Sequence, residues 1–102
     1  MSNDQVDPSI RAMRNLGPAC QRDLHQASIY TAEEVVKLGP KEAFLRIIKE
    51  KIARGGDLKC INAAYLYALY GAVHDVDWRE VPEQVKREYK QLTARLRRQM
   101  KR

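Results

Sequence analysis

Apolar residues recur at helical spacing along most of the chain, and no segment shows the alternation of polar and apolar residues that marks a half-buried strand. The pattern predicts an all-α fold, a compact bundle of about five helices with a helix-hairpin-helix-like N-terminal part and a long basic C-terminal helix. The expected helical segments are a short one that ends at residue 14, then 18–26, 31–38, 40–54, 58–74 and a last helix that begins at residue 82.

Two copies of Leu-Gly-Pro, at 16–18 and 38–40, predict sharp turns between consecutive helices. Glycine adopts the left-handed backbone that ends a helix, and proline fits the first position of the next helix. This layout is typical of helix-hairpin-helix modules, in which a glycine turn exposes backbone N–H groups at a helix N-terminus to an anion. Pro18 removes one of these donors, so the alternative is a turn with only a structural role.

Three further signals predict helix ends. Thr31 is a suitable N-cap, and Glu34 lies three residues later, where it can close a capping box. Gly55-Gly56 is expected to end the segment 40–54, and Asp57 to cap the segment that follows.

Two segments carry most of the expected core. One stripe of the segment 40–54 consists of Ala43, Phe44, Ile47, Ile48 and Ile52. The segment 58–74 is apolar around most of its circumference, and its small residues (Ala64, Ala68, Gly71 and Ala72) allow other helices to approach closely. We expect its tyrosines to lie in the core, with a base-stacking platform as the alternative. Trp78, in the following loop, is expected to fill a gap over the bundle.

The last helix combines an apolar seam with a concentrated positive charge. The seam is formed by Val85, Tyr89, Leu92, Leu96 and Met100. Residues 86–102 contain eight basic side chains and one acid, a net charge of +7, whereas the whole chain carries +6, so residues 1–85 sum to −1. A charge confined to one segment favours an acidic partner, and the alternative is a solvated helix whose charge keeps the protein soluble.

Length and composition indicate one soluble domain. The chain has 102 residues, of which 44% are hydrophobic and 31% are charged. Residues 1–8 are expected to form a flexible tail, and residues 9–102 a single helical domain. No signal peptide and no membrane span are recognisable, so we expect a cytoplasmic protein without a membrane partner. Cys20 and Cys60 lack a CxxC pattern and are expected to be buried or half-buried thiols.

Neither catalysis nor a cofactor is predicted. His25 and His74 belong to no HExxH motif and have no second histidine four residues away, so no metal site is expected. Cys20 has no general base nearby in the sequence. Gly55-Gly56 lacks the residues that surround the glycines of a phosphate-binding loop. We therefore expect a protein that is not an enzyme.

Several ordered segments resemble the C-terminal domain of the TfoX/Sxy family of competence regulators. The segments that carry the resemblance are 14–18 (RNLGP), 29–34 (IYTAEE), 38–44 (LGPKEAF), 66–72 (LYALYGA) and 77–82 (DWREVP). The likeness runs from about Ile10 to Leu92. Two positions depart from the family pattern: Ser28 replaces a usual glycine, and Tyr70 stands where an acidic residue is common.

The resemblance implies an all-helical domain with a helix-hairpin-helix-like element. Full-length members of the family are positive regulators of DNA-uptake genes that work with the cyclic AMP receptor protein at promoters. The chain has no room for the separate N-terminal domain of the family, so the resemblance covers the C-terminal domain alone.

Two functions are compatible with these patterns. The first is a non-catalytic regulatory module that acts through protein contacts with a transcription-related partner or with a second copy of the chain, with Tyr89, Leu92 and Leu96 as contact residues. The alternative is a weak DNA-binding module without sequence preference. Its candidate residues for DNA or another anion are Arg14, Gly17, Arg22, Lys86, Arg87, Lys90, Arg95, Arg97 and Arg98.

Overall fold

The computed structural model describes residues 7–56, 58–59 and 61–100, and all of its regular elements are helices over this part of the chain. The elements are α1 (Pro8–Arg11), α2 (Pro18–Gln26), α3 (Ala32–Leu38), α4 (Pro40–Ala53), α5 (Ala63–His74), the 3-10 helix η1 (Trp78–Glu80) and α6 (Glu83–Met100). The predicted all-α fold is confirmed. The first helix begins at Pro8, capped by Asp7, whose carboxylate accepts a 2.8 Å hydrogen bond from the Ser9 N–H.

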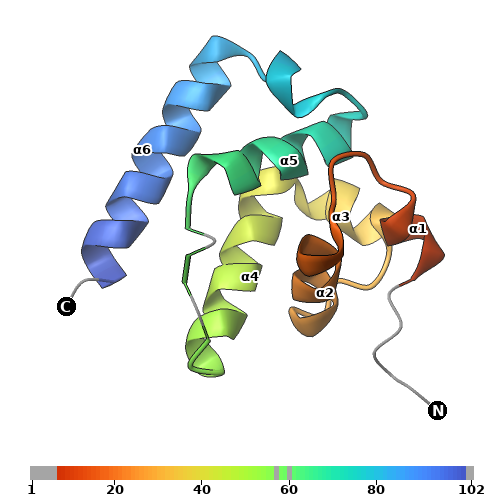
Figure 1. Ribbon diagram of the computed structural model, residues 1–102, viewed down its shortest axis with the longest axis horizontal. Helices are drawn as coiled ribbons and strands as arrows, with labels where there is room; N and C mark the ends of the chain where they lie inside the picture. The colour runs from red at the N-terminus through yellow and green to blue at the C-terminus, as the bar shows by residue number, and fades with distance from the viewer. Residues whose placement is uncertain (1–6, 57, 60, 101–102) are drawn as a thin grey trace.

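The helices surround α5, which crosses the centre of the molecule (Figure 1). The helix α4 packs against α5 and also contacts α2 and α3, while α6 covers the opposite flank of α5. The largest fully buried side chains of the core are Ile10, Leu24, Ile29, Val35, Phe44, Ile47, Leu66 and Leu69. Ile52, which was expected in the core, is 47% exposed near the end of α4, whereas Ile47 and Ile48 are buried.

The two Leu-Gly-Pro triplets form different turns. Gly39 has φ +84° and ψ 165°, a conformation that only glycine adopts without strain, and α4 begins at once with Pro40, as predicted. Gly17 instead has φ −74°, and the left-handed residue of the first turn is Asn15, with φ +67°. The helix α1 ends at Arg11, well before that turn. The expected left-handed glycine at position 17 is therefore wrong, and the helix-hairpin-helix likeness stays a prediction.

The ends of α3 and α4 follow the sequence signals closely. The Thr31 hydroxyl accepts a 3.2 Å hydrogen bond from the Glu34 N–H, as an N-cap should. In a complete capping box the Glu34 carboxylate would accept from the Thr31 backbone N–H. Here that carboxylate accepts a 3.3 Å hydrogen bond from the Thr31 hydroxyl instead. Gly55, at φ +68°, ends α4, and the Gly56 N–H donates to the Lys51 carbonyl at 2.8 Å.

The helix α5 starts five residues later than the sequence pattern predicts. Before the helix, the Ile61 N–H donates a 3.0 Å hydrogen bond to the Leu58 carbonyl. Asn62 then caps the helix, because its backbone is extended and its side chain accepts from the Tyr65 N–H at 3.0 Å. Asp57, the expected cap, lies outside the described residues, as does Cys60.

Another segment of the chain approaches α5 closely at Gly71, one of the small residues of this helix. The Asn15 side chain lies directly on this glycine and donates a 2.9 Å hydrogen bond to the Val76 carbonyl. The contact attaches the turn before α2 to the end of α5. Ala72 is also buried, whereas Ala64 is exposed and Ala68 is half-buried.

The loop before α6 is held by polar contacts and not by its tryptophan. Asp77 and Glu80 form a capping box around η1. Trp78 is 47% exposed, so the expectation that it fills a gap over the bundle is wrong, and Val81 is the buried residue of this loop. The helix α6 begins at Glu83, one residue later than predicted, and the Pro82 carbonyl accepts the Lys86 N–H at 2.9 Å.

Candidate functional site

The apolar seam of α6 faces the protein's own core. Tyr89 is only 7% exposed, and Val85, Leu92 and Leu96 are half-buried against the same core. The expectation that the seam is a free contact surface is therefore wrong for Tyr89, which other helices already cover. Leu92 and Leu96 keep part of their side chains accessible, while the side chain of Met100 lies outside the described part of the chain.

The basic residues of α6 have separate surroundings. Lys86 lies 3.7 Å from the Glu83 carboxylate, and the Arg97 Nε donates a 2.7 Å hydrogen bond to the Ile61 carbonyl, which attaches α6 to the segment before α5. Arg87, Lys90 and Arg98 are exposed and form no ion pair with any residue of the described ranges. At 100° per residue they lie on the side of α6 opposite or flanking the seam. We call these three residues the outer basic face.

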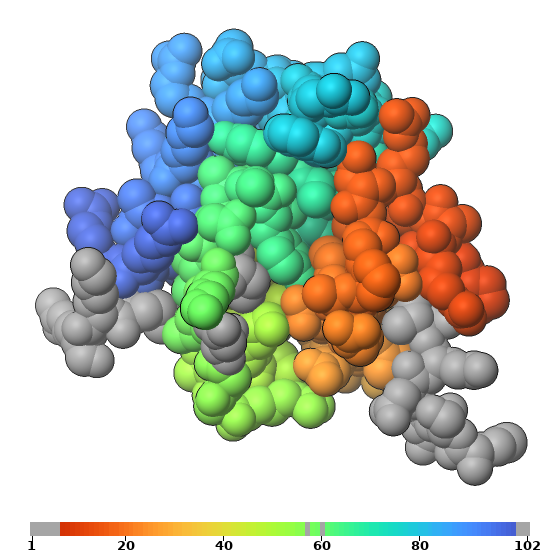
Figure 2. All heavy atoms as spheres, in the orientation of Figure 1, coloured from red at the N-terminus to blue at the C-terminus, as the bar shows by residue number. Residues whose placement is uncertain are grey.

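The other predicted anion-binding residues lie far from α6. The turn that contains Arg14 and Gly17 and the helix α2 that contains Arg22 occupy one side of the molecule, and α6 forms the other side (Figures 1 and 2). Arg14 and Arg22 are exposed. Gly17 is the N-cap residue of α2 and supplies no side-chain hydrogen bond. The structure therefore does not bring the predicted set together on one surface.

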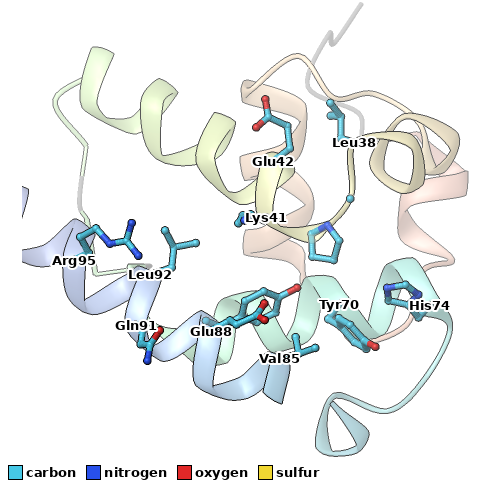
Figure 3. Close-up of a pocket in the computed structure, with 13 residues that line it drawn as sticks. Leu38, Lys41, Glu42, Tyr70, His74, Val85, Glu88, Gln91, Leu92 and Arg95 are labelled. Atoms are coloured by element: carbon cyan, nitrogen blue, oxygen red, sulfur yellow. The ribbon is translucent and has the colours of Figure 1, made fainter. Parts of the chain in front are cut away.

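A groove lies between the start of α4, the second half of α5 and α6, with a volume of about 530 Å³. We call it the α4–α6 groove. One wall comes from the turn between α3 and α4, and the other from α6, with α5 between them (Figure 3). The lining residues are Leu38, Gly39, Pro40, Lys41, Glu42, Tyr70, His74, Val85, Glu88, Tyr89, Gln91, Leu92 and Arg95.

Aromatic rings line the groove where α5 meets α6. The rings of Tyr70 and His74 have centroids 4.2 Å apart, and the ring of Tyr70 meets the ring of Tyr89 nearly edge-on, with centroids at 6.4 Å. Burial, and to a lesser degree the neighbouring Tyr70 and Glu88, raises the pKa of Tyr89 to about 12. Its hydroxyl is therefore neutral at physiological pH, and the groove presents an amphipathic aromatic surface.

Charged side chains flank this aromatic surface. Lys41 and Arg95 are exposed and form no ion pair within the described ranges. The Glu42 carboxylate lies 3.5 Å from the Arg46 Nε, so its charge is offset by a cation outside the groove. Glu88 is the remaining carboxylate of the lining. The arrangement can hold an amphipathic partner by apolar contact and charge.

Among the described residues, no group of three or more histidine, cysteine, aspartate or glutamate side chains could hold a metal ion. Within the same ranges, no helix combines the length and the apolar character that crossing a bilayer requires. Cys20 is half-buried, and the His25 ring packs edge-on against the Tyr30 ring at 5.2 Å.

Parts of the groove are recognisable in the sequence, but the groove itself is not. The Leu38-Gly39-Pro40 turn, Tyr70 and the α6 seam were each recognisable in the sequence. Tyr70 and His74, four residues apart, could have been read as one face of α5. Their position opposite the start of α4 depends on how α6 packs. The pattern of residues along the chain does not show this packing.

The chain is similar to known proteins both in sequence and in structure. The profile of the TfoX C-terminal domain matches residues 6–93. A search of curated proteins gives no significant match. A crystal structure described as that of an uncharacterized protein from Listeria monocytogenes, in a triclinic form, superposes with a TM-score of 0.73 at 34% sequence identity. That match covers 86% of this chain and 92% of the other.

Proposed function

Because the chain belongs to the TfoX C-terminal domain family, we propose that it is a non-catalytic interaction module of competence or transcription control, which acts in the cytoplasm through protein contacts. The observation that supports protein contacts is the α4–α6 groove. Interface cores are enriched in aromatic residues and arginine, and they are often surrounded by a polar rim. The groove offers Tyr70, His74 and Leu92 beside Lys41 and Arg95.

The groove also explains how α6 can serve both stability and binding. The seam of α6 packs on α5, which fixes the position of the helix, and the edge of the seam at Leu92 stays accessible in the groove. A partner can therefore bind without removing α6 from the core. Interface backbones that are already ordered usually move little on binding.

Site-specific photo-cross-linking in cells tests this proposal. A photoreactive amino acid replaces Gln91, which lines the groove, and in a control protein it replaces Lys49, an exposed residue of α4 outside the groove. We expect a cross-linked component of the transcription apparatus at position 91 only, and its loss when Tyr70→Ala is added. Equal cross-linking from both positions, or cross-links that survive Tyr70→Ala in a folded protein, would contradict a contact through the groove.

DNA binding is the second candidate, and the outer basic face of α6 supports it. Arg87, Lys90 and Arg98 are exposed cations without ion-pair partners in the described ranges, which is the arrangement that phosphate contacts need. Fluorescence anisotropy with a labelled duplex at two salt concentrations measures this directly. Binding that weakens steeply with salt supports the candidate, and no binding at low salt removes it.

A further inference from the structure

The shape and the charge of the α4–α6 groove favour one kind of partner segment. Resting on the proposed function, we propose that the groove receives an acidic amphipathic helix of the partner. The apolar face of that helix contacts Tyr70, Val85 and Leu92, and its carboxylates face Lys41 and Arg95.

The dimensions suit about three helical turns. The lining residues of α6 run from Val85 to Arg95, which at 1.5 Å per residue is a length of about 15 Å. A partner helix laid along this wall places apolar side chains at positions i, i+3 or i+4 and i+7 against the groove, as helix-in-groove complexes do. The rings of Tyr70 and His74, in mutual contact, and the aliphatic side chain of Val85 provide the apolar surface.

The charges favour an acidic helix over a basic one. Lys41 on the α4 wall and Arg95 on the α6 wall carry charges that no described ion pair offsets. Of the two carboxylates in the lining, Glu42 is paired with Arg46, so Glu88 alone opposes the two cations. The outer basic face adds positive potential beside the groove, and the whole chain carries +6. Complementary potential of this kind sets partner choice and association rate.

The same charges disfavour two other occupants. A second copy of the chain would bring another net charge of +6 to a surface that is already cationic. The unpaired cations that a nucleic acid could contact lie on the outer basic face of the protein, away from the apolar lining of the groove.

Three helical peptides of equal length separate the possibilities. The first carries three leucines on one face and glutamates elsewhere, the second has lysines in place of the glutamates, and the third has the composition of the first in a scrambled order without an apolar face. Fluorescence anisotropy measures affinity for the full chain, and chemical shifts of the ¹⁵N-labelled protein locate the contact. We expect the acidic amphipathic peptide to bind about tenfold more tightly than either of the others, with shifts at Tyr70, Leu92 and Arg95.

Two charge variants provide the matched test. Arg95→Glu changes a cation of the groove, and Lys49→Glu makes the same change in net charge on an exposed part of α4 outside it. Reversing a charge beside the bound peptide should weaken binding about fivefold, whereas Lys49→Glu should change it less than about twofold. Equal weakening by both variants would mean that only the net charge of the protein attracts the peptide, and it would overturn the inference.

The outcomes also separate this inference from the proposed function. If the lysine peptide binds in the groove as tightly as the acidic one, the acidic partner is wrong while a protein contact at the groove stands. If no peptide binds at millimolar concentration, the inference is overturned, and the cross-linking from position 91 decides the proposed function independently. Tyr70→Ala gives a second disruption of the groove, and Arg95→Glu still decides if that variant does not fold.

Discussion

The Tyr65 hydroxyl donates a 2.6 Å hydrogen bond to Asp23 Oδ2, and this contact joins α5 to α2 across 42 positions of sequence. The other oxygen of the same carboxylate lies 3.1 Å from Lys51 Nζ on α4, so one aspartate connects three helices. Burial, followed by the nearby Cys20 and Asp23, raises the pKa of Tyr65 far above its ordinary range. Its proton therefore stays available to Asp23 at every physiological pH.

Replacing Tyr65 by phenylalanine tests what this contact contributes. Tyr65→Phe keeps the ring that packs on Phe44 but leaves Asp23 Oδ2 without its donor in a half-buried site. We expect a loss of about 1–3 kcal/mol in the free energy of unfolding, measured by urea denaturation. The control is Tyr30→Phe, since Tyr30 is exposed and its hydroxyl makes only a 3.4 Å contact with Ser28; it should stay within about 0.5 kcal/mol of the parent.

Alkaline pH should destabilise the fold through its buried tyrosines. The pKa of Tyr89 is about 12 in the folded protein and about 10 when unfolded, so the folded state holds this proton more tightly. Its contribution to stability is complete below pH 10 and is lost as the pH rises through 12. We expect the urea midpoint to fall over this interval, and to fall less steeply in Tyr89→Phe. An identical pH dependence in the variant would contradict the raised pKa.

Gly71 and Gly17 form a matched pair for testing close packing. A Cβ at Gly71 would overlap the Asn15 side-chain nitrogen and lie 2.5 Å from the Val76 carbonyl oxygen, which is backbone and cannot easily move. Gly71→Ala should therefore cost more than about 2 kcal/mol in the free energy of unfolding. Gly17→Ala meets no atom within 4 Å and has an ordinary φ of −74°, so it should be near neutral. Comparable losses in both variants would contradict the packing of Asn15 on α5.

The elements that sequence reasoning located well are those with a local signal at each end. The predicted range 18–26 is the observed α2, because Pro18 fixes its first position and the apolar spacing continues to its last turn. The helix α4 begins after Gly39 and ends just before Gly55, and both glycines have the positive φ values that favour this residue. The start of α5 differs from the prediction because Leu58 and Ile61 continue the apolar pattern although both lie before the helix.

What the sequence did not contain is the relation between distant segments. Trp78 and Val81 are both apolar residues of one short loop, and only the packing of η1 on α5 decides that Val81 turns inward. Similarly, Tyr70 departs from the family pattern in the sequence, but its place in the groove depends on α6 on one side and the start of α4 on the other. Arg14 and Arg95 share a charge, but the turn that contains Arg14 and the helix α6 that contains Arg95 lie on different sides of the molecule (Figure 1).

The packing of α6 also determines how DNA binding must be tested. Deleting everything after Pro82 would remove Tyr89 and Thr93, both buried, together with the tie from Arg97 to the Ile61 carbonyl. We expect that truncated protein to lose cooperative unfolding, measured by circular dichroism during urea denaturation, because the flank of α5 would be exposed. A truncated protein that still unfolds cooperatively would contradict this account of α6. If the truncated protein is unfolded, its failure to bind DNA says nothing about phosphate contacts.

A triple substitution on the outer basic face avoids this problem. Arg87→Gln, Lys90→Gln and Arg98→Gln together change only exposed side chains, so the helical signal and the urea midpoint should stay close to those of the parent. If these residues each contact a phosphate, the slope of log K against log salt should become less negative by about 2.7, three contacts at 0.9 each, in duplex titrations followed by anisotropy. The control combines Arg14→Gln, Arg22→Gln and Lys49→Gln, an equal loss of charge on other surfaces. A larger change of the salt slope in that control than in the triple variant would indicate that DNA contacts those other surfaces and not α6.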